Sequence, residues 1–143
     1  MNKLTIETRF DLEDLIAAYC HSYDNKDIDT FSALFIPDAP IQIYNASALV
    51  TDSSFDQLVE DFKSRMDMHK QLGVQTRHYQ TNPRFIRADD GRVNATMNLL
   101  IQHQHADESV PRTVHTGLYK SVFEETDDGW KYARHEIHID HGG

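Results

Sequence analysis

Two tyrosines and an aspartate gather at the end of an early amphipathic segment. Tyr19, Tyr23 and Asp24 are spaced so that one face of a helix would carry all three side chains. Among the nine histidines, His78 and His103 are the candidate partners of the aspartate. A carboxylate that binds an imidazole holds it in the tautomer that a general base requires. The sequence therefore indicates acid–base chemistry at a site that the fold assembles from distant segments.

Length, charge and cysteine content limit the possible function classes. The chain has 143 residues and a mass of 16.5 kDa, so we expect one domain over residues 1–143. A net charge of -9 disfavours a nucleic-acid partner, and no apolar run is long enough to cross a bilayer, so we expect no membrane partner. The first residues lack a secretion signal and Cys20 is the single cysteine, which favours a cytoplasmic protein without intrachain disulfides.

Familiar catalytic and metal-binding motifs are missing from the sequence. It contains no glycine-rich phosphate loop, no Cys-x-x-Cys pair, no Gly-x-Ser-x-Gly elbow and no His-Glu-x-x-His helix. His103 and His105 could join His78 or His115 around a metal ion, but chance pairs are common among nine histidines. We therefore predict no metal site and no organic cofactor, and we interpret the histidine-rich segment 135–141 as an edge or a tail.

Apolar residues at helical spacing predict three helices in the first half of the chain. The first helix has an inward stripe made of Leu12, Leu15, Ile16, Tyr19, Cys20 and Tyr23. Asp27 can cap a short second helix, and a Ser-x-x-acid start at Ser53 opens a third helix that ends before Gly73. Between the second and third helices, residues 41–44 alternate like a half-buried strand, and the polar residues 45–52 indicate a loop.

From residue 76 onward the apolar period changes from helical to two. Turn signals separate four long strands near residues 75–87, 92–105, 112–124 and 130–140. Helices followed by a meander of strands form an α+β plan, in which the helices pack on one face of a strongly curved antiparallel sheet.

Alternation along a strand assigns its side chains to two faces. In the second long strand, one face carries Val93, Ala95, Met97, Leu99, Ile101 and His103. We expect the helices to cover this face, because five apolar residues precede the histidine. In the next strand His115 and Tyr119 share a face, and in the last strand Tyr132 and Arg134 do.

Several short motifs together resemble a known family. Residues 22–29 read Ser-Tyr-Asp-Asn-Lys-Asp-Ile-Asp, Tyr44 follows on the first strand, and Leu72-Gly73 precedes Thr76-Arg77-His78. These motifs, and the interval from His78 to His103, resemble the scytalone dehydratase-like and SnoaL-like branch of the NTF2-like (cystatin-like) superfamily. The resemblance covers nearly the whole chain. It implies a cone of curved sheet wrapped over a long helix, an apolar pocket inside, and homo-oligomers, dimers or trimers, formed through the sheet.

The resemblance also implies roles for individual residues. It makes His78 the central acid and base, Asp24 its orienting carboxylate and His103 a second imidazole in the pocket. Tyr23 and Tyr44 would polarise a substrate carbonyl. The spacing of Tyr19 and Asp24 is similar to a Tyr-x-x-x-x-Asp pattern of bile-acid dehydratases. The remaining expected substrate contacts are Tyr19, Met97, Leu99, His115 and Arg134.

Two functions from different classes follow. The first is a cofactor-independent lyase, above all a dehydratase of a small hydroxylated carbonyl compound of aromatic, polyketide or steroid-like character, with isomerase or cyclase chemistry as a close variant. The second is a non-catalytic ligand-binding or assembly module, similar to the small subunit of ring-hydroxylating dioxygenases. Convergence of Asp24, His78 and His103 in a cavity would favour the enzyme, whereas a pocket plugged by Met97, Phe62 or Phe31 would favour the module.

Overall fold

A computed structural model of the chain describes residues 3–141. Its three helices are α1 (Ile6–Asp24), α2 (Ile28–Ala33) and α3 (Phe55–Leu72). Its strands are β1 (Pro40–Asn45), β2 (Ala48–Ser54), β3 (Val74–Arg87), β4 (Val93–His105), β5 (Arg112–Thr126) and β6 (Gly129–Ile139). Among residues 3–141, no helix has the length and hydrophobicity that spanning a bilayer requires.

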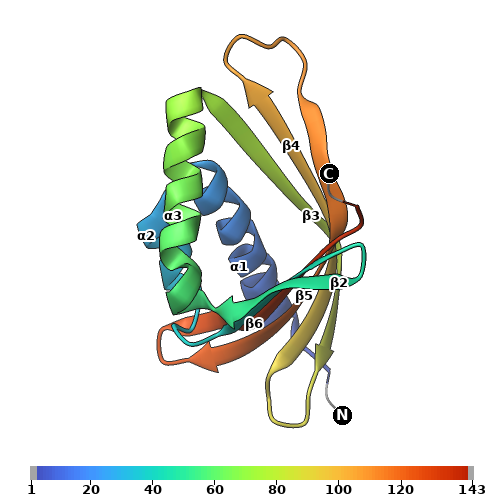
Figure 1. Cartoon of the computed structure of the whole chain (residues 1–143). Coiled ribbons are helices and arrows are strands. Elements are labelled where there is room, and N and C mark those ends of the chain that lie inside the picture. The colour runs from blue at the N-terminus through green and yellow to red at the C-terminus, as the bar shows by residue number, and fades with distance from the viewer. Residues whose placement is uncertain (1–2, 142–143) are drawn as a thin grey trace.

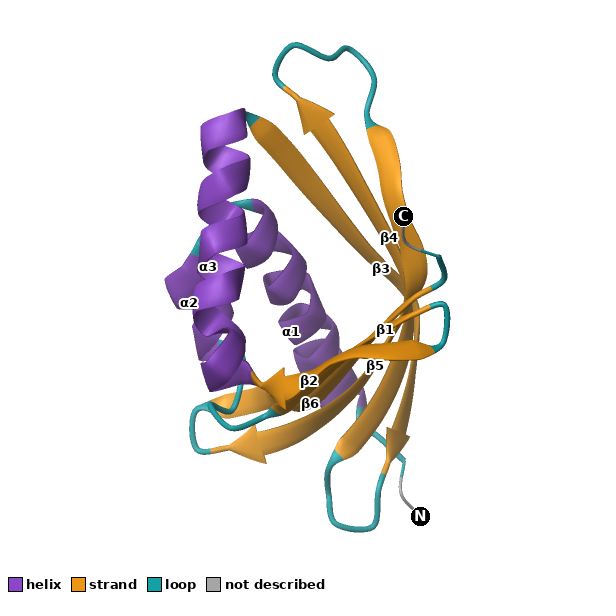
Figure 2. Ribbon diagram, in the orientation of Figure 1, coloured by secondary structure: helices purple, strands orange, loops and turns teal. Residues whose placement is uncertain are grey.

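The sheet curves strongly and remains open. Its strand order is β2-β1-β6-β5-β4-β3, and neighbouring strands are antiparallel except β1 and β6, which run parallel. Figure 1 shows α1 and α3 on the concave side of the sheet, and Figure 2 shows the same separation of helices from strands by colour. The predicted α+β class, with helices on one face of a curved sheet, is confirmed.

Local signals define the ends of the helices. Asp27 caps α2, since its side chain accepts a hydrogen bond from the backbone N–H of Thr30 at 3.1 Å. Gly73 ends α3 in the left-handed conformation with φ 66°, which a glycine adopts without steric cost. The start of α3 lies one residue later than predicted, because Ser54 is the N-cap and Gln57 accepts its backbone N–H at 3.2 Å.

The predicted loop over residues 45–52 is wrong for its second half. Residues 48–54 form β2, which pairs antiparallel with β1. Ala46 and Ser47 make the tight turn between them, with φ 49° and 71°. Since β2 is an edge strand with mostly exposed side chains, no apolar alternation is imposed on its sequence, and pairing with β1 alone makes it a strand.

The prediction that segment 135–141 is an edge or a tail is also wrong. β6 lies inside the sheet, between β1 and β5, and His135 is only 1% exposed. Ala133 is an extra residue that shifts the register of β6 against β5. Because of this bulge Tyr132 and His135 both face the helices, whereas Arg134 faces outward, so the predicted shared face of Tyr132 and Arg134 is wrong.

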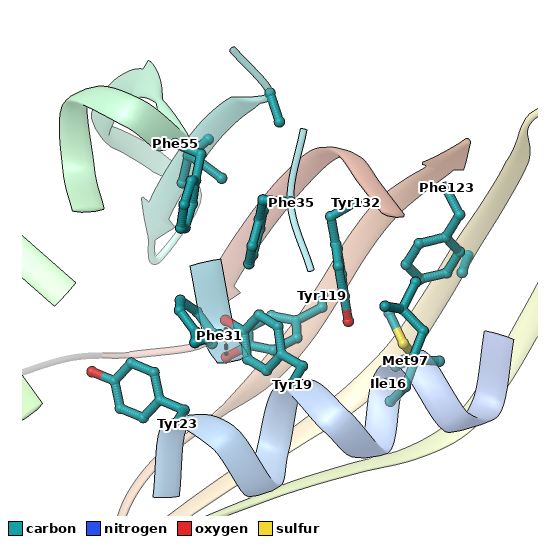
Figure 3. Packing of buried hydrophobic residues seen from close by; sticks show 14 of the residues in the cluster. Ile16, Tyr19, Tyr23, Phe31, Phe35, Phe55, Met97, Tyr119, Phe123 and Tyr132 are labelled. Atoms are coloured by element: carbon teal, nitrogen blue, oxygen red, sulfur yellow. Dashed lines mark hydrogen bonds between the residues drawn. The ribbon is translucent and has the colours of Figure 1, made fainter. Parts of the chain in front are cut away.

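Buried aromatic rings fill one end of the concave face. Figure 3 shows Phe35 between Phe55 and Tyr132, and the ring centroids lie 4.2 and 4.9 Å apart. Tyr19 of α1 contacts the same cluster, and Met97 of β4 lies on its sheet side. The core therefore covers the concave face of the sheet around Met97 and Tyr132. Farther along the same face, the side chains are more polar and line a cavity.

Candidate active site

Asp24 and His78 meet at the end of α1. Nδ1 of His78 lies 2.6 Å from Oδ1 of Asp24, and the backbone N–H of His78 donates to Oδ2 at 2.8 Å. The Thr76 hydroxyl donates to Oδ1 at 2.8 Å. Because an ionised carboxylate only accepts hydrogen bonds, Nδ1 carries the hydrogen, and in the neutral ring Nε2 then carries the lone pair. The side chains of His78 and Asp24 are only 8% and 6% exposed, so solvent screens the pair weakly.

The backbone explains why these side chains converge. α1 ends with Asp24, and the chain then turns through Lys26, whose φ is 60°. Alternation along β3 points Thr76 and His78 to the concave side, where the end of α1 lies. In the sheet, Thr76 is paired with His103 and His78 with Ile101. Neighbouring strands therefore place the second predicted histidine on the same face as the first.

His78 forms part of the wall of a cavity of about 490 Å³. Three other histidines and three tyrosines share this wall, namely His69, His103, His115, Tyr19, Tyr23 and Tyr119. Ile43, Ile101, Ile137 and Ile139 supply apolar surface, and Phe62 also borders the space. The core residues Phe31 and Met97 lie outside the wall, so they do not plug the cavity.

The cavity opens to solvent between α3 and β2. Met68 of α3 and Val50 of β2 line it and are 46% and 60% exposed. Its volume lies within the usual range of about 300–1,000 Å³ for small-molecule sites. A small organic molecule can therefore enter and reach the imidazole of His78.

The second and third histidines of the wall are held in their neutral forms. Burial, followed by the nearby His69, lowers the pKa of His103 to about 4. Burial and the neighbouring cations Lys26 and Arg65 lower the pKa of His69. The two rings meet edge to face at 5.0 Å. At neutral pH they offer one donor and one acceptor nitrogen each, without adding positive charge.

Tyr23 lies directly beside the His78 ring. The ring centroids are 4.8 Å apart in an edge-to-face arrangement. Burial raises the pKa of the Tyr23 phenol, while the charge and hydrogen bonding of the Arg65 guanidinium oppose that rise. Figure 3 shows the Tyr23 hydroxyl pointing away from the aromatic core. Tyr23 is thus a hydrogen-bond donor next to the imidazole.

A second polar chain lies deeper, behind Tyr19. Nε2 of His135 lies 3.2 Å from the Tyr19 hydroxyl, and Nδ1 lies 2.8 Å from Oγ of Ser121. Tyr19 in turn donates to the Tyr119 hydroxyl at 3.5 Å. Complete burial lowers the pKa of His135 to about 3, so its ring is neutral and supports the tyrosines through hydrogen bonds. The bulge in β6 hid this histidine from an analysis based on alternation.

A second hollow of about 500 Å³ lies between α1 and β3, on the other side of His78. Asp24 and Cys20 line it. Burial, with the Asp24 charge next, raises the pKa of the Cys20 thiol to about 11, which makes this cysteine a poor nucleophile. The first cavity is the stronger candidate, because it brings His69, His103 and His115 to His78.

Two predicted site residues lie on the outer face of the sheet. Tyr44 pairs in register with His138 and stacks on its ring at 4.4 Å, while the preceding residue Ile43 lines the cavity. Arg134 bonds to Gln42 and to Glu136 on the same outer face. Neither residue reaches the cavity, so the expectations that Tyr44 polarises a carbonyl and that Arg134 contacts substrate do not agree with the geometry.

The other predicted contacts divide between wall and core. Tyr19 and His115 line the cavity. Met97 and Leu99 face the same side of β4 as His103 but are 1% and 3% exposed and belong to the core. Both side chains belong to the core beside the site and do not line the cavity, so the expected direct contact with substrate does not agree with the structure.

The sequence analysis missed the contribution of α3 to the wall. Arg65, Met68 and His69 line the cavity from this helix, with Arg65 one turn and the other two about two turns after Phe62. The spacing of three and seven residues that puts Arg65 and His69 on the side of Phe62 was the available signal. Charged residues beside such a stripe are usually solvated, so the pattern alone did not distinguish a cavity wall from an exposed edge.

Within residues 3–141, no group of three or more His, Cys, Asp or Glu side chains is placed to hold a metal ion. His103 and His105 do not share a site, because His105 lies 4.0 Å from Glu108 and lines a different hollow.

Comparisons with known proteins place the chain in a family. The structure is similar to ActVI-ORFA from Streptomyces coelicolor, with a TM-score of 0.75 and 19% identity over 92% of this chain and 97% of that one. It is also similar to two proteins from Novosphingobium aromaticivorans. One is a candidate scytalone dehydratase, with a TM-score of 0.70 and 18% identity over 94% and 88% of the two chains. The other is the beta subunit of a candidate aromatic-ring-hydroxylating dioxygenase, with a TM-score of 0.74 and 17% identity over 91% and 87%.

Because the sequence identities to these three structures are low, the similarities show only that the folds are shared. No sequence among curated proteins matched the chain. The protein-family model of the SnoaL-like domain, however, matches the sequence over residues 4–136. The protein therefore belongs to the SnoaL-like family, whose NTF2-like fold the helices and the open curved sheet reproduce.

Proposed function

We propose that this protein is a cofactor-independent lyase that removes water from a small hydroxylated carbonyl compound. The observation that carries the proposal is the contact of 2.6 Å between Asp24 and His78, with His78 on the wall of a cavity open to solvent. A base held in one tautomer and facing a small-molecule cavity is what proton abstraction beside a carbonyl requires. The likeness to a candidate scytalone dehydratase supports the same class of reaction.

The proposed reaction uses only side chains of the wall. Nε2 of His78 removes a proton from the carbon next to the carbonyl, and Asp24 stabilises the imidazolium that forms. The carbonyl oxygen becomes an enolate, which accepts a hydrogen bond from the Tyr23 hydroxyl. The enolate then expels the β-hydroxyl, and the protonated His78 donates its proton to the departing oxygen. One water molecule and an α,β-unsaturated carbonyl compound result, and His78 returns to its starting state.

The direct test is turnover of a model β-hydroxy ketone. Loss of water from 3-hydroxy-1-tetralone gives 1-naphthol after tautomerisation, which fluorescence detects. We expect product with the wild-type protein and with His138→Ala, which alters a histidine on the outer face, but not with His78→Ala. Failure of the wild-type protein both to release water and to exchange the α-protons for deuterium, across a panel of cyclic hydroxy ketones with and without a carboxylate group, would overturn the proposal. Exchange without loss of water would show enolisation without dehydration, which favours isomerase chemistry instead.

A non-catalytic assembly module is the second candidate, because one structural relative is the beta subunit of a candidate dioxygenase. The unplugged cavity favours the enzyme, since a scaffold has no need of a solvent-open space beside a buried acid–histidine pair. If the protein is such a module, we expect neither turnover nor α-proton exchange. We also expect the protein to be isolated in a complex with a larger subunit.

A further inference from the structure

We infer that the molecule bound in the cavity is an organic anion, and that Arg65 at the cavity mouth binds its carboxylate. This inference deepens the proposed function, because it names the charge of the substrate of the same site.

Arg65 has no anionic partner among the residues that the structure describes. It is an exposed residue of α3 that lines the cavity one turn after Phe62. Among residues 3–141, no carboxylate oxygen lies within 4.0 Å of its side-chain nitrogens, although other arginines, such as Arg92 and Arg112, form such ion pairs. The guanidinium group is therefore available for a ligand, and its planar fork of donors matches a carboxylate.

The charge of the wall contrasts with the charge of the protein. The chain contains 23 acidic residues and has a net charge of -9. None of the described residues that line the cavity is an aspartate or a glutamate, and Arg65 is the single lysine or arginine among them. The neighbouring His69 and His103 are neutral, since their pKa values are lowered. Asp24 lies behind His78 and outside the lining, so the wall itself presents one cation and no carboxylate, which favours an anion beside Arg65.

The wall also presents apolar surface for the body of a ligand. Ile43, Ile101, Ile137 and Ile139 line the cavity that His78 also lines. The wall thus offers Arg65 for a charge and isoleucine side chains for an apolar body.

The distance from Arg65 to the base limits the size of the anion. Arg65 contacts the hydroxyl end of Tyr23, and the Tyr23 ring lies 4.8 Å from the His78 ring. Arg65 and His78 therefore flank the same tyrosine, so one small molecule can reach both. A carboxylic acid built on one or two fused rings spans the interval between these two residues.

Two isosteric probes test the inference through binding alone. Naphthalene-2-carboxylate and naphthalene-2-carboxamide have nearly the same shape and differ in charge. By isothermal titration calorimetry at pH 7, we expect the carboxylate to bind about tenfold or more tightly than the amide, since only the carboxylate forms a charge-assisted hydrogen bond with both partners ionised. In R65Q the two probes should bind with equal affinity, while the affinity for the amide should remain unchanged.

The matched control is K63Q, which removes the same charge from an exposed position of α3 outside the wall. This variant should retain the preference for the carboxylate. Equal affinities in the wild-type protein, no binding of either probe, or a preference that survives in R65Q would each overturn the inference. His78→Ala should keep the preference. A wild-type protein that prefers the carboxylate but releases no water from any hydroxy ketone would therefore refute the proposed lyase and leave the anion site standing.

Discussion

Asp24 holds His78 at two atoms, the backbone nitrogen at 2.8 Å and the ring nitrogen Nδ1 at 2.6 Å. The first bond fixes the position of β3 against the end of α1, and the second fixes the orientation and tautomer of the ring. One carboxylate therefore links the fold and the proposed chemistry. Changes at this residue must be measured for both stability and turnover.

Asp24→Asn should abolish most of the proposed activity without preventing folding. The amide keeps the shape of the side chain but no longer fixes the His78 tautomer or stabilises the imidazolium. By analogy with other acid–histidine pairs, we expect turnover to fall by roughly two to four orders of magnitude. We also expect a stability loss of about 1–3 kcal/mol, because buried hydrogen bonds are lost. Steady-state kinetics and urea unfolding measure the two effects.

Two variants serve as controls for this prediction. Thr76→Val removes one hydrogen bond to Asp24 without touching His78, so its effect on turnover should be much smaller. The double variant Asp24→Asn, His78→Ala should be scarcely worse than either single change, because the pair acts as a unit. If Asp24→Asn destabilises the protein while the folded fraction keeps normal turnover, Asp24 is a structural residue.

Phenylalanine substitutions should separate Tyr23 from Tyr44. Tyr23 lines the cavity beside His78, whereas Tyr44 stacks on His138 outside it. We expect Tyr23→Phe to reduce turnover by about tenfold to a hundredfold, through the lost donor to the enolate, and Tyr44→Phe to leave it nearly unchanged. Kinetics of the two variants on the same hydroxy ketone give the comparison. A larger loss for Tyr44→Phe would restore the role that the sequence resemblance implied.

His135 should make the protein less stable below pH 6.5. Its pKa is about 3 in the folded state and 6.5 when unperturbed, so between these values the unfolded chain binds more protons. Stability is fully present above pH 6.5 and declines as the pH falls toward 3. The contribution of His135 should be about 2 kcal/mol between pH 7 and pH 5.

Urea unfolding of the wild-type protein and of His135→Asn at both pH values measures this contribution. The variant should be less stable at pH 7, because it changes the bonds to Tyr19 and Ser121, but its stability should depend less on pH. An equal pH dependence in the two proteins would show that His135 does not carry the effect.

The protein should form a homo-oligomer in solution. The sequence resemblance implies assembly through the sheet, and the outer face of β3 exposes the apolar side chains Tyr79 and Ile86. Light scattering at micromolar concentration should give the mass of a dimer or a trimer. A mass near 16.5 kDa would contradict this expectation.

Local signals in the sequence predicted most of the elements, and the resemblance to a known motif predicted the central pair. Helical and twofold periods, together with Asp27 and Gly73, gave three helices and four long strands within a few residues of their observed limits. These signals are local, because a cap or a turn depends on residues only a few positions apart. The spacing of Asp24 and His78, compared with a known motif, anticipated a contact that the structure contains.

Tertiary structure decided which side chains face the cavity. The extra residue Ala133 reverses the faces of β6, so that His135 enters the core and Arg134 leaves it. Parallel pairing of β1 with β6 places Tyr44 outside, and packing of α3 brings Arg65 to the cavity mouth. Bulges, strand register and helix packing depend on contacts between residues far apart in the chain. Because a shift of one residue turns a side chain to the opposite face, periodicity along the sequence could not fix these positions.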